Sequence, residues 1–237
     1  MKKSMMIKLA AMVLSLIFLS GCSQQRTPLQ EQISRAVANK KYVLLYIENS
    51  DDQESIKLKE AFIAAASSQK ELFSIVEADA KTDVKSITEY LGQESIQLPA
   101  VALIAPNSAR VKMFQVPVSI EDIMNARVTE AESKVLLSLQ SDRIVLLCVF
   151  AGELEAFKYI ETKLSDALIS FSDRAHIHYL NPAVADDRSY IDKLSLPSDR
   201  SMIHVMLPSG EIIDQFSMDT INTTDLTDLI MKHSTTK

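Results

Sequence analysis

Apolar and polar residues follow the same succession of patterns in both halves of the chain. Two continuous apolar runs, VLLYI at 43–47 and IVLLCVF at 144–150, are typical of strands buried on both faces of a sheet. Before each run, apolar residues recur every three or four positions, as in Leu29, Ile33 and Val37, which is the spacing of a helix packed on a core. The pattern therefore predicts an α/β protein in which helices and buried strands alternate.

After its buried strand, each half continues with the same elements. A longer amphipathic helix, a second strand, a short helix, two β-rich arms and a closing helix follow. Pro-Asn-Ser at 106–108 and Pro-Ser-Gly at 208–210 are reversal signals between the arms of each hairpin. The predicted order is α-β-α-β-α-β-β-α in each half, with the short helices at 84–91 and 189–194 and the closing helices at 120–127 and 224–233.

A shift of about 102 residues brings the two halves into register. Val43 then falls on Val145, Pro106 on Pro208 and Phe114 on Phe216. One offset holds through every element, which is the mark of an internal repeat. We therefore predict a tandem duplication, with domains at 28–128 and 129–237.

The N-terminus has the pattern of a targeting segment. Three lysines precede an apolar run at 9–19, which is too short to span a bilayer but fits the core of a signal peptide. The run ends in Leu-Ser-Gly-Cys at 19–22, which resembles the lipobox of bacterial lipoproteins. The resemblance implies a signal peptide at 1–21, cleavage before Cys22, acylation of Cys22 by palmitate-type chains, and a tether at 22–27.

The residue after the lipid site indicates the membrane to which the protein is sorted. Ser23, rather than aspartate, resembles the outer-membrane sorting signal of Gram-negative lipoproteins. The expected location is the bacterial cell envelope, with the protein anchored by lipid to the outer membrane and facing the periplasm. Several acyl chains contribute about 0.8 kcal/mol for each buried methylene, which is enough for a durable anchor.

Composition and charge exclude several classes of protein. The chain has a formal net charge of −6, and without residues 1–21 it has 22 basic and 31 acidic side chains, a net charge of −9. That balance is opposite to the basic surface of a nucleic-acid-binding protein. The four glycines are too scattered for a Walker A or dinucleotide loop, and HExxH and GxSxG are absent, so no cofactor is expected.

The order of elements resembles the thioredoxin fold, once at 28–128 and again at 130–234. The strongest local likeness lies in NKKYVLLYI, IVEAD and LGQESIQLPAVALIAPNSARV, which resemble thioredoxin-like relatives of periplasmic disulfide-handling proteins. The resemblance implies a mixed sheet with an antiparallel hairpin and flanking helices in each domain. In the family, the helix after the first buried strand begins with CxxC, where the helix N-terminus lowers a thiol pKa. The corresponding windows, 50–55 and 151–155, hold no cysteine, so a redox-inactive protein and not an enzyme is expected.

The same resemblance implies a peptide-binding edge. The family places a cis-proline before the hairpin, facing the helix start, and Pro99 occupies this place in the first half. The candidate edge consists of Glu48, Asp51, Asp52 and Pro99, although the sequence favours a capped and solvated helix start for the two aspartates. The second half has Ser201 at the matching position and is not expected to keep the edge.

These observations favour an envelope lipoprotein that acts as a protein- or peptide-binding adaptor or as an assembly or chaperone-like module. Its expected partners are the membrane, through the lipid, and an envelope protein or peptide. One alternative is a thiol-disulfide oxidoreductase that uses Cys148, although a cysteine inside an apolar strand is typical of a core residue. Another is a small-ligand- or metal-binding lipoprotein whose site combines Cys148 with His176, His178 and His204, a spacing that matches no zinc signature.

Overall fold

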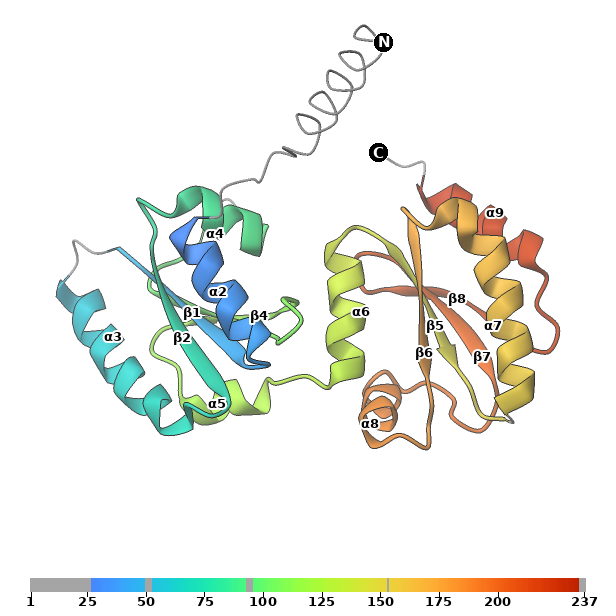
Figure 1. The fold of residues 1–237 in the computed structure, drawn as a ribbon, viewed down its shortest axis with the longest axis horizontal. Helices are drawn as coiled ribbons and strands as arrows, with labels where there is room; N and C mark the ends of the chain where they lie inside the picture. The colour runs from blue at the N-terminus through green and yellow to red at the C-terminus, as the bar shows by residue number, and fades with distance from the viewer. Residues whose placement is uncertain (1–26, 50–52, 93–95, 153, 235–237) are drawn as a thin grey trace, which may run out of the picture.

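Two four-stranded mixed sheets form the framework of the protein. The computed structural model describes residues 27–49, 53–92, 96–152 and 154–234. The strand order is β2-β1-β3-β4 in the first sheet and β6-β5-β7-β8 in the second. Figure 1 shows the two sheets on either side of helix α6. We call the elements from α2 to α5 the first unit and those from α6 to α9 the second unit.

The elements of the first unit are α2 (Pro28–Ala38), β1 (Tyr42–Glu48), α3 (Gln53–Ala66), η1 (Ser67–Gln69), β2 (Phe73–Asp79), α4 (Val84–Leu91), β3 (Ala100–Ile104), β4 (Arg110–Gln115) and α5 (Ile120–Asn125). Those of the second unit are α6 (Glu130–Gln140), β5 (Ile144–Val149), α7 (Leu154–Leu168), η2 (Ile169–Phe171), β6 (Ala175–Leu180), α8 (Ala185–Lys193), β7 (Met202–Met206), β8 (Ile212–Ser217) and α9 (Thr223–Ser234).

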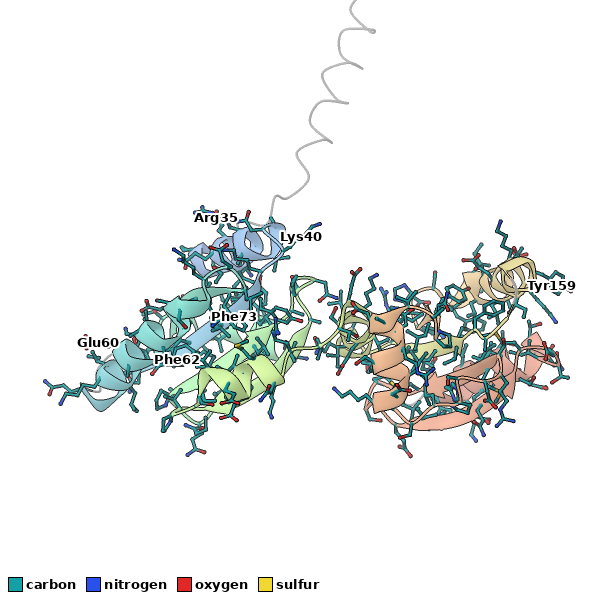
Figure 2. All side chains as sticks on the ribbon, turned by 90° about the horizontal axis from the view of Figure 1, so that it is seen from below. Arg35, Lys40, Glu60, Phe62, Phe73 and Tyr159 are labelled. Carbon is teal, nitrogen blue, oxygen red and sulfur yellow. The ribbon has the colours of Figure 1, made fainter. Side chains whose placement is uncertain are left out.

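Strand β1 is the centre of the first unit because its apolar residues are buried on both faces. It pairs in parallel with β2 and antiparallel with β3, and β4 completes the sheet as the outer arm of a hairpin. On one face Leu45 packs under α2 and α4, and on the other Leu44 packs under α3 and α5. Phe62 and Phe73 belong to this second cluster, and Figure 2 shows them turned inward while Glu60 points away from the sheet.

The second unit repeats this arrangement around β5. Val145 and Leu147 face the cluster formed with α6 and α8, whereas Leu146 and Cys148 face the cluster formed with α7 and α9. Figure 1 shows α7 and α9 together on the side of this sheet away from α6. Removing such large apolar side chains from water stabilises each unit by about 2 kcal/mol for each fully buried residue.

The internal repeat is confirmed element by element. Each strand of the second unit begins 102 residues after its counterpart in the first unit. Thr27 and Thr129 are both N-caps whose hydroxyl oxygens accept a backbone N–H three residues later. Lys40 and Asp142, also 102 residues apart, both adopt a positive φ. The same offset thus extends to the turns and caps.

The predicted fold class is confirmed: the chain holds two tandem thioredoxin-like α/β units. Each has a central strand with one parallel neighbour and one antiparallel neighbour that leads into a hairpin. Two predicted boundaries were wrong: α5 ends at Asn125 and not at 127, and α8 begins at Ala185 and not at 189. Asp186 and Asp187 occupy its first turn, where carboxylates interact favourably with the helix dipole.

Candidate functional site

The predicted peptide-binding edge lies at the carboxyl end of β1. Glu48 is the last residue of that strand, and the pairing of Ile47 with Ala100 places Pro99 beside it. The Leu98–Pro99 peptide bond is cis, as in the resemblance described above. Asp51 and Asp52, the other two candidate residues, lie outside the described residues.

The Pro99 carbonyl is already engaged within the first unit. It accepts hydrogen bonds from the Val116 backbone N–H at 3.1 Å and from Gln115 Nε2 at 2.9 Å. Gln115 is exposed, so its side chain marks the surface next to Pro99. The polar groups of this edge that face solvent therefore belong to neighbours of Pro99 and not to its carbonyl.

Glu48 contributes a buried carboxylate to the same edge. The residue is only 6% exposed, and its Oε1 forms an ion pair with Lys59 of α3. Lys59 Nζ also lies 3.2 Å from Glu77 Oε2, so one ammonium serves two carboxylates. The hydrogen bond to Glu48 is the main reason why the pKa of Lys59 is raised. Glu48 Oε2 is buried and has no hydrogen-bond partner among the described residues, which leaves an acceptor for an N–H or ammonium group.

The described residues contain one cysteine, Cys148, and it is buried. Its side chain is fully buried near the carboxyl end of β5, and burial raises the pKa of its thiol far above the ordinary value. A thiolate is the nucleophile in disulfide chemistry, so this environment opposes it. The interpretation of Cys148 as a core residue is confirmed.

Serine replaces proline at the matching place in the second unit. The Ser201 carbonyl accepts from the Met218 N–H at 3.1 Å, as the Pro99 carbonyl does from Val116. The Ser201 Oγ accepts from the Ala151 N–H at 3.1 Å and so fixes the loop that follows β5.

A cleft of about 460 Å³ opens beside that loop, at the carboxyl ends of the parallel strands β5 and β6. Its lining is mostly apolar, with Phe150 and Pro182 among the side chains and Gly152 at the rim. Strand ends of this kind are where α/β proteins bind ligands. The sequence analysis assigned no site here; the one local signal was a glycine and a proline directly after two neighbouring parallel strands.

The histidines do not assemble with Cys148. His176 and His178 project from the same face of β6, as their spacing predicts. One ring nitrogen of each, His176 Nδ1 and His178 Nε2, lies 2.8 Å from Ser138 Oγ. His204 on β7 is separated from His178 by Leu147, which pairs with both of them across β5. Cys148 faces the opposite side of the sheet. Across residues 27–49, 53–92, 96–152 and 154–234, no group of three or more candidate ligands is close enough to hold a metal ion.

Burial lowers the pKa of all three strand histidines. For His178, burial acts first and the neighbouring His176 and Lys134 add to it, which lowers its pKa to about 4. Burial and the Arg143 charge lower the pKa of His176, and burial and Arg200 lower that of His204. All three shifts favour the uncharged form of the imidazole.

The described residues include no helix that is both long enough and apolar enough to cross a bilayer. The predicted lipid site, Cys22, lies outside the described residues.

No protein-family model and no curated protein matches the chain. Several solved structures are similar to it. Human ERp44 in its zinc-bound form shares 12% identity at a TM-score of 0.37, over 86% of this chain and 58% of the ERp44 chain. Fasciola hepatica thioredoxin shares 17% identity at a TM-score of 0.34, over 44% of this chain and 93% of its own. The first two thioredoxin domains of Saccharomyces cerevisiae Eps1p share 12% identity at a TM-score of 0.29, over 89% of this chain and 99% of theirs. TM-scores this low carry no inference, so the fold assignment rests on strand order and pairing.

Proposed function

We propose that this protein is a lipid-anchored component of the bacterial envelope that binds a protein or peptide partner and carries out no redox chemistry. It acts as an adaptor or as an assembly or chaperone-like module. The observation that carries the proposal is the burial of Cys148 on a thioredoxin-like scaffold whose two helix starts hold no cysteine. A scaffold of this kind, without a reactive thiol, retains surfaces for binding.

The proposed binding edge is the carboxyl end of β1. Glu48 Oε2 is a buried acceptor without a partner among the described residues, and a donor from a bound chain would remove that cost. Pro99 lies beside it in the sheet register. The surplus of acidic side chains, −9 without residues 1–21, favours a basic or polar partner through long-range attraction.

Anchoring through Cys22 is tested by lipid labelling. The intact protein, expressed in a Gram-negative host and fed an alkyne fatty acid, is expected to carry the label and to fractionate with the outer membrane. Cys22→Ala should lose the label and leave the membrane fraction, whereas Cys148→Ala, the matched control, should keep both. Unlabelled intact protein, or label that persists in Cys22→Ala, contradicts the anchor.

Partner binding is tested by crosslinking in intact cells. A photo-reactive residue at position 115, next to Pro99, is expected to capture one partner, and Glu48→Gln in the same chain should reduce its yield. The control is the same probe at position 159, where Tyr159 is 71% exposed on the outer side of α7 (Figure 2). Equal capture at both positions contradicts binding at this edge. So does a crosslinking yield at position 115 that is unchanged by Glu48→Gln.

A further inference from the structure

Helix α6 is held by both units. On the first unit, the Gln140 side chain accepts from the Arg110 N–H at 2.9 Å and donates to the Arg110 carbonyl at 2.6 Å. The Tyr42 hydroxyl donates to the Val128 carbonyl at 2.6 Å, two residues before the helix begins. These contacts attach both ends of α6 to the first unit, and none of them involves a group that titrates between pH 4 and 7.

The attachment of α6 to the second unit includes two histidines. Ser138, which is 4% exposed, places its Oγ 2.8 Å from His176 Nδ1 and 2.8 Å from His178 Nε2. The two rings lie edge to face with their centroids 5.0 Å apart. An ion pair of 2.6 Å between Glu132 and Lys193 of α8 also holds α6 on the second unit, as does apolar packing of Val135, Ala131 and Leu139.

Neutral imidazoles let Ser138 both donate and accept within the cluster. A hydroxyl has one proton to donate and two lone pairs to accept with. With neutral rings, Ser138 donates to one ring nitrogen and accepts from the N–H of the other. When both rings are protonated, both nitrogens carry protons and Ser138 must accept twice. Its own proton is then left with the Lys134 carbonyl, 3.4 Å away.

The charges around the cluster also oppose protonation. Lys134 of α6 lowers the pKa of His178, and Arg143, before β5, lowers that of His176. The carboxylates nearby are Glu130, which is 2.7 Å from Lys134, and Asp186 and Asp187 of α8, which share a small cleft with His178. None of them forms an ion pair with either ring among the described residues. Two imidazolium rings in van der Waals range of each other would therefore also lie near the positive charges of Lys134 and Arg143.

We propose that the Ser138–His176–His178 cluster is an acid-sensitive latch between α6 and β6. At neutral pH the latch holds α6 on the second unit. In mild acid its protonation releases α6 from β6, while Gln140 and Tyr42 keep the helix on the first unit. The sheet of the second unit then separates from α6 along the α6–β6 contact.

The size of the effect follows from proton linkage. His178 has a pKa of about 4 when the latch is closed and regains an ordinary value of 6.5 when it opens. Because the pKa is lowered in the closed form, the closed latch keeps its full stability above pH 6.5. It is progressively disfavoured as the pH falls from 6.5 to about 4. From His178 alone, the opening equilibrium at pH 5 is about 30-fold larger than at pH 8.

Hydrogen exchange on the chain without residues 1–21, corrected for the intrinsic effect of pH, tests the latch. Amides in 130–140 and 175–180 are expected to open about 30-fold more at pH 5 than at pH 8. The counterpart helix α2, which has no histidine partner, should change little. His176→Gln/His178→Gln keeps carboxamides near Ser138 but does not titrate, and it should abolish the difference. His204→Gln, which removes a buried histidine elsewhere in the sheet, should retain it.

Two results overturn the latch. One is wild-type protein in which α6 and β6 exchange alike at pH 8 and pH 5. The other is a pH response that survives His176→Gln/His178→Gln. If that variant fails to fold, an NMR titration of wild-type His178 decides, because the proposal requires the midpoint of its Cε1–H signal to coincide with the opening of α6.

Discussion

The two units place different chemistry on the same backbone positions. In the first unit, Glu48, Lys59 and Glu77 form a charged cluster at the carboxyl end of the central strand. The residues 102 positions later are Phe150, Glu161 and Tyr179, and two of these line the apolar cleft. Tyr179 is partly buried, and burial raises the pKa of its hydroxyl to about 12. One strand end thus carries a buried carboxylate, and the equivalent strand end of the second unit has an aromatic lining.

The difference teaches that conservation of the scaffold does not fix the chemistry at its strand ends. Strand pairing, bulge position and N-caps coincide at one offset, because they are set by backbone hydrogen bonds and burial. The loops and strand ends contribute few of these hydrogen bonds and little of this burial, so their side chains differ between the units. Each unit therefore requires its own functional test.

The largest expected effect comes from breaking the charged cluster of the first unit. Lys59→Met leaves the buried Glu48 carboxylate without its cation and should lower the free energy of unfolding by about 3 kcal/mol. Urea unfolding of the chain without residues 1–21 measures it. Glu48→Leu/Lys59→Met removes both charges and should recover most of the loss. The matched change in the second unit, Glu161→Met, should lie within about 0.5 kcal/mol of wild type. A single variant no less stable than the double variant would mean that the ion pair contributes nothing.

A smaller effect is expected at Cys148, which takes the place of Tyr46 in the repeat. Cys148→Ser puts a hydroxyl into an apolar cluster and should lower the free energy of unfolding by about 2 kcal/mol, whereas Cys148→Ala should cost about 1 kcal/mol. The wild-type thiol should resist a disulfide reagent near neutral pH and react fully in denaturant. Rapid labelling of native protein would favour the oxidoreductase alternative instead.

The smallest effect concerns the residue that replaces proline. Ser201→Ala removes the acceptor of the Ala151 N–H and should lower the free energy of unfolding by about 1 kcal/mol. The control is Ser172→Ala at an exposed site, which should lie within about 0.5 kcal/mol of wild type in the same urea titration. Equal effects at the two serines would show that the Ser201 hydroxyl does not anchor the loop after β5.

The periodicity of apolar residues was sufficient to predict both sheets, because β1 and β5 are buried on both faces and their helices carry clear apolar stripes. It also placed His176 and His178 on one face, since strand residues two apart always share one. The partner of these histidines, Ser138, lies on a helix 38 residues earlier, and no local pattern indicates a contact of that range. For the same reason, periodicity could not show that Lys59 reaches Glu48, or that Cys148 and His204 face opposite sides of one sheet.

The junction between the two units also covers one edge strand of the first sheet. Strand β4 is the outermost strand of the first sheet, and the Gln140 carboxamide satisfies the Arg110 backbone as a neighbouring strand would. Ile212 holds the equivalent position in β8, and no side chain from the described part of the chain bonds its backbone. Helix α6, which opens the second unit, thus covers the edge strand of the first unit at Arg110.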